Sequence, residues 1–113
     1  MSVTQLNELY AIAPTPTTIG PIDVRDCRLG SLSIENVDGT GQTLDGTIRT
    51  AVYPGGSAGA SSLADLTAIA QGASNTRRLD VDCAACSDLY IDLTASGLGC
   101  NARVSWRPDQ GRR

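Results

Sequence analysis

The sequence of 113 residues contains no histidine, no lysine and no phenylalanine. Without histidine the chain lacks the usual general base and the commonest metal ligand at neutral pH. All nine basic residues are arginines, and twelve acids outnumber them to give a formal net charge of −3. Such a mild acidic balance offers no basic surface for nucleic acid or for an anionic membrane. We therefore expect neither as a partner.

Long apolar runs and catalytic motifs are also missing. No segment approaches the 18 or so consecutive apolar residues of a membrane-spanning helix, so we expect no such helix. The N-terminus lacks a basic region followed by an apolar core, which predicts synthesis in a reducing cytosol without a secretory signal. No Ser-His-Asp, Cys-His or phosphate-binding glycine pattern occurs. We accordingly predict that the protein is not an enzyme and holds no cofactor.

Alternating apolar and polar residues fill the stretch from Leu79 to Trp106. A strand places successive side chains on opposite faces, so strict alternation predicts one buried face and one solvated face. Three runs show this pattern, with inward positions at Leu79, Val81 and Cys83, then Leu89, Ile91, Leu93 and Ala95, then Cys100, Ala102, Val104 and Trp106. We predict a meander of three strands joined by four-residue hairpin loops at 84–87 and 96–99.

Shorter strands are predicted upstream of this stretch. Residues 22–29 form one, with a bulge near Arg25 or Asp26, and residues 31–37 and 47–53 form two more. Asp45-Gly46 is expected in a turn, and residues 54–62 in a flexible loop. Residues 63–70 fit either a short helix or an edge strand. Six or seven strands predict an all-β fold, a single antiparallel β-sandwich of jelly-roll or Greek-key type over residues 22–107.

Residues 1–21 are predicted to form an N-terminal arm on this sandwich. Apolar residues recur every third position at Val3, Leu6, Leu9 and Ile12, so we predict a short amphipathic helix over 2–13. Three prolines in residues 13–21 favour an extended, polyproline-like strap. So short a helix is marginal in water and needs a surface to cover its apolar stripe. That surface is either a partner or the domain's own sheet edge. Residues 108–113 are predicted to be a tail.

The cysteines are the most specific chemical feature, at Cys27, Cys83, Cys86 and Cys100. The spacing of Cys83 and Cys86 is that of half a zinc knuckle, but no second close pair follows. Thiols, one or two disulfides and a zinc site all remain open. Four acids are expected on the polar face of two neighbouring strands, at Asp80, Asp82, Asp88 and Asp92. We interpret them as a solvated surface rather than a calcium site.

The segment from about Gly46 to Arg107 contains a strand, a small-residue loop and the run R-R-L-D-V-D-C-A-A-C-S-D-L-Y-I-D-L-T-A-S-G-L-G-C-N-A-R-V-S-W-R. With its T-A-S-G turn and V-S-W closing strand, this pattern resembles the C-terminal half of small β-sandwich proteins in the virions of tailed bacteriophages. The resemblance implies a capsid decoration (cement) protein, a head fibre base or a tail component.

We therefore expect a non-enzymatic phage virion structural protein, in the first place a cement protein that bridges and stabilises capsid subunits. It would be made in the host cytoplasm, lie on the capsid surface, and bind the major capsid protein or neighbouring copies of itself. The candidate partner-binding residues are Val3, Leu6, Leu9 and Ile12. The alternatives are a tail or baseplate component, a carbohydrate-binding module that uses Tyr53 or Tyr90, and a small zinc- or calcium-dependent binding domain.

Overall fold

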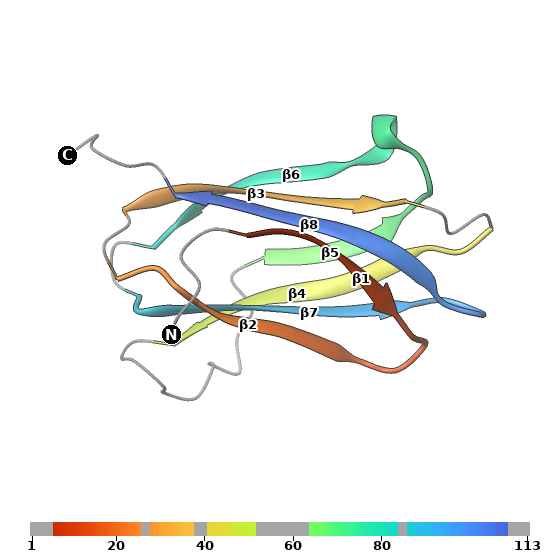
Figure 1. Ribbon diagram of the computed structural model, residues 1–113, viewed down its shortest axis with the longest axis horizontal. Coiled ribbons are helices and arrows are strands. Elements are labelled where there is room, and N and C mark those ends of the chain that lie inside the picture. The colour runs from red at the N-terminus through yellow and green to blue at the C-terminus, as the bar shows by residue number, and fades with distance from the viewer. Residues whose placement is uncertain (1–5, 26–27, 38–40, 52–63, 84–85, 109–113) are drawn as a thin grey trace.

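The computed structural model describes residues 6–25, 28–37, 41–51, 64–83 and 86–108. In these ranges eight strands form two antiparallel sheets of four strands each, packed face to face (Figure 1). The first sheet has the order β1 (Leu6–Ile12), β8 (Cys100–Pro108), β3 (Leu29–Asn36), β6 (Arg77–Asp82). The second sheet has the order β2 (Thr17–Asp23), β7 (Asp88–Ala95), β4 (Leu44–Ala51), β5 (Ala64–Ile69). A 3-10 helix, η1 (Ala73–Asn75), precedes β6. No helix in these ranges is long and apolar enough to cross a membrane.

Successive strands cross from one sheet to the other at every step except between β4 and β5, which are neighbours in the second sheet. Eight strands connected in this order form a jelly roll, the double-sheet arrangement of two Greek keys. The predicted all-β sandwich is therefore confirmed, and its topology is the jelly-roll alternative.

The predicted meander is wrong. Strand β6 pairs with β3, β7 pairs with β2 and β4, and β8 pairs with β1 and β3, so these three strands are not neighbours. The connection at 96–99 therefore joins two sheets rather than closing a hairpin. Alternation reports which face of a strand is buried, and in a sandwich the strands of both sheets bury one face. It carries no information about which strand lies alongside.

The predicted core is confirmed. Five side chains from β7 and β8 have no exposed surface and belong to one cluster, namely Leu89, Ile91, Leu93, Val104 and Trp106. They meet across the space between the sheets, because β7 and β8 belong to different sheets. Gly30 makes room for the largest of them, since a Cβ at this inward position would overlap the ring of Trp106.

Residues 6–12 and 17–23 are two strands of the sandwich, so the predicted helix and polyproline strap are wrong. Strand β1 pairs with β8 along its whole length, and β2 pairs with β7. Leu6 and Ile12 are six residues apart, an even offset that places both on the inner face of a strand. Pro21 lies in β2, an edge strand, where a missing backbone N–H is tolerated.

Several strand boundaries also differ from the prediction. The strand expected at 22–29 is divided, because β2 ends at Asp23 and β3 begins at Leu29. The turn expected at Asp45-Gly46 lies inside β4, where a Cβ on Gly46 would overlap the backbone oxygen of Asp92 on β7. Residues 64–69 form the edge strand that was one of the two alternatives. The loop expected at 54–62 lies outside the described residues.

Candidate assembly surfaces

The predicted partner-binding stripe is not one surface. Leu6 and Ile12 are buried in the domain's own core, whereas Leu9 faces outward from β1 and is 51% exposed. Val3 lies outside the described residues. A period of three cannot be kept on one face of a strand, because odd offsets alternate sides.

Strands β1 and β2 lie together along one open side of the sandwich (Figure 1). Between them a hollow of about 330 Å³ is lined by Leu6, Ile19 and Ile22, with Glu8 and Tyr10 above. The Tyr10 hydroxyl donates to Oε2 of Glu8 at 3.4 Å. Burial, and then the neighbouring carboxylate of Glu8, raise the pKa of Tyr10. A charged residue at an inward position of an edge strand discourages further strands from pairing there.

The connection between β7 and β8 lies at one end of the sandwich (Figure 1). Leu98, at its tip, is 94% exposed. The side chain of Gln42 holds the turn from below, because its Oε1 accepts the Leu98 N–H at 3.1 Å. Ser96 Oγ accepts the Thr43 N–H at 2.8 Å, and the Ser96 N–H donates to the Thr43 oxygen at 2.9 Å. The leucine is therefore carried on a turn with a fixed backbone.

Two glycines allow this turn to form. Gly97 has φ 56° and Gly99 has φ 93°, which are conformations that residues with a Cβ rarely adopt. A Cβ at Gly97 would also overlap Oε1 of Gln42, so the side chain that fixes the turn needs glycine there.

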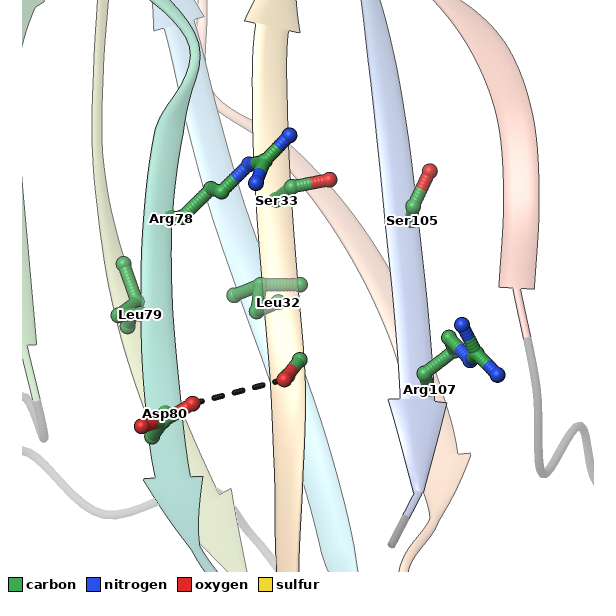
Figure 2. Close-up of a pocket in the computed structure, with 8 residues that line it drawn as sticks. Leu32, Ser33, Arg78, Leu79, Asp80, Ser105 and Arg107 are labelled. Atoms are coloured by element: carbon green, nitrogen blue, oxygen red, sulfur yellow. Dashed lines mark hydrogen bonds between the residues drawn. The ribbon is translucent and has the colours of Figure 1, made fainter.

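A polar groove runs over the outer face of the first sheet, across β6, β3 and β8 (Figure 2). We call it the serine groove. It encloses about 610 Å³ above the hydroxyls of Ser31, Ser33 and Ser105, with Arg78 on β6 and Arg107 on β8 at its rim. The remaining lining residues are Leu32, Leu79 and Asp80. No aromatic side chain lines it, so it offers no stacking platform for a sugar ring or a base.

Charge in the serine groove is not neutralised internally. Asp80 accepts a hydrogen bond from the Ser31 hydroxyl at 3.5 Å, the dashed line in Figure 2. Arg78 and Arg107 are exposed, and neither makes an ion pair with any residue that the structure describes. Two arginines and one aspartate line the groove, which leaves a net charge of +1.

The outer face of the second sheet carries a hollow of about 710 Å³ and opposite sign. We call it the acidic hollow. Its lining includes three acids, Asp45, Asp65 and Asp92, and one base, Arg49, for a net charge of −2. Asp45 Oδ1 accepts the N–H of Ala68, the residue in β5 with φ 48°. This acid therefore also fixes the irregular backbone of an edge strand.

Asp92 lies at the centre of a hydrogen-bond network in the acidic hollow. Its Oδ1 accepts from the Thr18 hydroxyl and its Oδ2 from Arg49 Nε, both at 2.6 Å, while Thr47 donates to Oδ2 at 3.3 Å. Burial alone would raise the pKa of Asp92, but the hydrogen bonds and the charge of Arg49 outweigh it, so the net shift is downward. The carboxylate stays ionised and bridges β2, β4 and β7.

The four acids do not form the single polar surface that the sequence predicted. Asp80 and Asp82 lie on β6 in the first sheet, Asp92 lies on β7 in the second, and Asp88 is buried at the start of β7. Within the described part of the chain, no group of three His, Cys, Asp or Glu side chains is placed to hold a metal ion.

The three described cysteines are present as thiols. Cys83 is buried, and Cys86 and Cys100 are half-buried. The fourth, Cys27, lies outside the described residues. Tyr90 is half-buried in β7, and Tyr53 lies outside the described residues.

Sequence reasoning missed Asn36, Gln42 and Leu98. The Asn36 side chain is fully buried and its Nδ2 donates to the backbone oxygens of Gln42 and Ile69 at 3.0 and 3.1 Å. The only available signals were a polar residue at the inward end of a strand and an apolar residue between two glycines.

No protein-family model matches this sequence, and a search of curated proteins finds no match. Solved structures of similar fold include a protein of Bacillus endospore appendages, and these appendages are reported to form a family of disulfide-linked pili. It is 11% identical, with a TM-score of 0.55 over 92% of this chain and 84% of that chain. Two structures of infectious bursal disease virus also match. They are the VP2 subviral particle (15% identity, TM-score 0.46, 92% of this chain and 29% of that one) and the Gx strain (15%, 0.42, 99% and 32%). At 11% identity the likeness to the endospore appendage protein shows the fold alone.

Proposed function

We propose that this chain is a non-enzymatic structural subunit that works in many copies on a particle, and specifically that it is a capsid decoration (cement) protein. The observation that carries the proposal is Leu98. A leucine that is 94% exposed and mounted on a hydrogen-bonded turn is already ordered before it meets a partner. Preorganisation of this kind lowers the entropic cost of association. Full burial of such a side chain contributes about 1.5–3 kcal/mol.

Other features support the same proposal. The sequence contains none of the catalytic motifs considered above, and this agrees with a role in assembly. The edge strand β1 carries the inward Glu8, and the edge strand β2 contains Pro21. These features disfavour uncontrolled strand pairing, so we expect contacts through side chains at defined points.

The experiment compares two exposed leucines. In its natural source the protein should purify with intact capsids and be released by a mild chaotrope. Leu98→Ser should weaken that binding by about 10- to 150-fold. The melting temperature should not change, because the side chain contributes little to the core. Leu9→Ser, a matched change at a residue that is 51% exposed, should bind as the wild type does. Full capsid binding by Leu98→Ser would contradict the proposal.

A fibre subunit is the second candidate, favoured by the placement of two thiols. Cys86 precedes β7 and Cys100 begins β8, so they lie at opposite ends of an eight-residue strand, roughly 26 Å long at about 3.3 Å per residue. Two half-buried thiols on different copies could join end to end, with loss of two protons and two electrons to oxygen or to a small disulfide. The structurally similar pilus protein is reported as disulfide-linked. Ladders on non-reducing gels that vanish in the Cys86→Ser and Cys100→Ser variants would favour the fibre over the cement protein.

A further inference from the structure

Part of the hydrophobic core stays open to solvent on one side of the sandwich. The hollow of about 330 Å³ between the edge strands β1 and β2 has Leu6, Ile19 and Ile22 in its lining. We call it the edge hollow. Leu6 and Ile19 are 9% and 5% exposed, against 2% or less for every other leucine, isoleucine and valine of the core except Ile69. The edge hollow is therefore a place where aliphatic surface of the domain has no cover of its own.

The turn between β7 and β8 carries an apolar side chain of the complementary kind. Leu98 is almost wholly exposed, and the glycines on either side of it have no side chains that would crowd it. Its backbone is held in place, because the Leu98 N–H donates to Oε1 of Gln42 at 3.1 Å. A leucine that protrudes alone from a fixed turn can enter a hollow between two strands, whereas a flat apolar patch cannot.

We infer that Leu98 of one copy inserts into the edge hollow of a second copy. The inference rests on the proposed function, which it extends by naming the surface that receives Leu98. The turn lies at one end of the sandwich and the edge hollow lies on its open side, so the two surfaces are different (Figure 1). The contact is therefore heterologous. Each copy gives one leucine and receives one, and copies join in rings or open chains.

The edge hollow has the size and the chemistry for one aliphatic side chain. A cavity of about 150 Å³ is enough to hold benzene, so a hollow of about 330 Å³ can admit a leucine. The strands that border it belong to different sheets, which pack about 10 Å apart. Glu8 and Tyr10 also line it and can stay in water at its mouth, as polar groups do around the apolar centre of a protein interface.

A contact through one leucine is weak between free molecules and strong between molecules that are held together. Burial of a leucine strengthens association by about 10- to 150-fold, and the contact is smaller than a standard interface of about 800 Å² per partner. Copies that sit side by side on a particle have a high effective concentration, so each contact adds to the binding of its neighbours. A decoration protein built in this way would bind its particle cooperatively.

The test uses two variants of the full chain that each remove one half of the contact. Leu98→Ser removes the inserted side chain, and Glu8→Trp places an indole ring at the mouth of the edge hollow. In sedimentation velocity at millimolar concentration, each variant alone should self-associate about 10- to 150-fold more weakly than the wild type. An equimolar mixture should form dimers and nothing larger. Leu98 of the Glu8→Trp copy can enter the open hollow of the Leu98→Ser copy, and no further pair of surfaces is then left.

Three further variants separate a blocked hollow from other effects of Glu8→Trp. Ala11→Trp adds the same ring to an exposed position of β1 that is absent from the lining of the edge hollow, and Glu8→Gln removes the charge without filling the mouth. Both should self-associate as the wild type does. Thr17→Trp blocks the edge hollow from β2 and should behave as Glu8→Trp does, so the result does not depend on the folding of one variant. Thermal unfolding identifies the variants that are folded.

Three results in solution would overturn the inference. They are a wild type that stays monomeric at millimolar concentration, folded Leu98→Ser or hollow-blocking variants that self-associate as strongly as the wild type, and a mixture of Leu98→Ser with Glu8→Trp that forms no dimers.

Binding to capsids judges the proposed function separately. If Leu98→Ser and Glu8→Trp lose capsid binding to the same extent, copies hold one another on the particle as inferred. If only Leu98→Ser loses it, Leu98 contacts the capsid itself, so the inference is wrong while the proposed function stands. If the wild type binds no capsids but the mixture forms dimers, the contact between copies stands and the cement function is wrong.

Discussion

Asn36 gives the most exacting test of how the two sheets are held together. It ends β3 in the first sheet, and its buried side chain donates to the backbone oxygen of Gln42, just before β4, and to that of Ile69 at the end of β5. Ile69 lies in the second sheet, and Gln42 lies on the connection that leads into it. Asn36→Asp keeps the shape of the side chain but replaces the donating nitrogen with a second oxygen. Two carbonyl oxygens then face a carboxylate instead of a donor.

The cost can be worked from these two contacts. A buried acceptor left without its donor costs about 1–3 kcal/mol, which gives about 2–6 kcal/mol for two. The hydrogen bond to Gln42 is only partly buried, so water can replace part of it and the lower half of the range, about 2–4 kcal/mol, is expected. At about 4 °C per kcal/mol for a domain of this size, the melting temperature should fall by about 8–16 °C.

The effect of Asn36→Asp should also depend on pH, with a definite sign. A buried carboxyl that faces two carbonyl oxygens has a raised pKa in the folded state, so folding favours its protonated form. The protonated acid can donate to one of the oxygens. Stability of the variant, relative to wild type, should therefore increase as the pH falls from neutrality towards the ordinary aspartate pKa of about 3.9, and be lost again as the pH rises.

The assay uses the single tryptophan, Trp106, which is fully buried and should report global unfolding through its fluorescence. Urea unfolding at a series of pH values would be compared with Asn75→Asp. Asn75 is exposed and its side chain donates to the Gln71 oxygen, so the same chemical change there should cost little. Equal stability of the two variants, or the same pH dependence in both, would refute the view that Asn36 holds the sheets together.

Burial was predictable from the sequence because it depends on the parity of single strands. Ile91 and Val104 are buried as their alternation predicts. Pairing was not predictable in the same way, because it depends on which distant strand supplies a partner. Strand β8 pairs with both β1 and β3. Leu6 lies opposite Trp106, 100 residues away, and Ile34 lies opposite Val104, 70 residues away. No local pattern encodes such a choice.

The N-terminal error has a physical origin as well. Six residues separate Leu6 from Ile12, and this interval returns to the same face in a strand while also continuing a period of three. Only Leu9 distinguishes the two interpretations, because it lies on the opposite face and is exposed. The segment forms a strand despite its helix-like period of three, because pairing with β8 satisfies the backbone hydrogen bonds of β1 along its full length.

The candidate surfaces were the least predictable part of the molecule. The serine groove collects Ser31, Arg78 and Ser105 from three strands that are distant in sequence, and only the jelly-roll order places them together. Leu98 differs, because its position between two glycines was visible in the sequence as part of a turn. The sequence does not show that the side chain of Gln42, which lies on a different connection, fixes this turn.

Further predictions concern the core, the cysteines and the acid limb of stability. Ile91→Ala should cost about 2–5 kcal/mol in urea unfolding, because its side chain has no exposed surface, whereas a loss below about 1 kcal/mol would contradict its place in the core. Elemental analysis should find no stoichiometric zinc, and a chelator should leave the melting temperature unchanged; about one zinc per chain would oppose this. Asp92→Asn should remove part of the acid sensitivity. The pKa of Asp92 in the folded protein is below its ordinary value of 3.8, because hydrogen bonds from Arg49 and Thr18 outweigh the opposing effect of burial. A lowered pKa stabilises the fold above the ordinary value and loses that contribution as the pH falls through the folded-state pKa. The wild type should therefore exceed Asp92→Asn by about 1–2 kcal/mol at pH 7, for a charge-assisted pair that is partly open to solvent. This difference should shrink below about pH 4. A constant difference from pH 7 to pH 2 would show that the ionised form of Asp92 does not hold β2, β4 and β7 together.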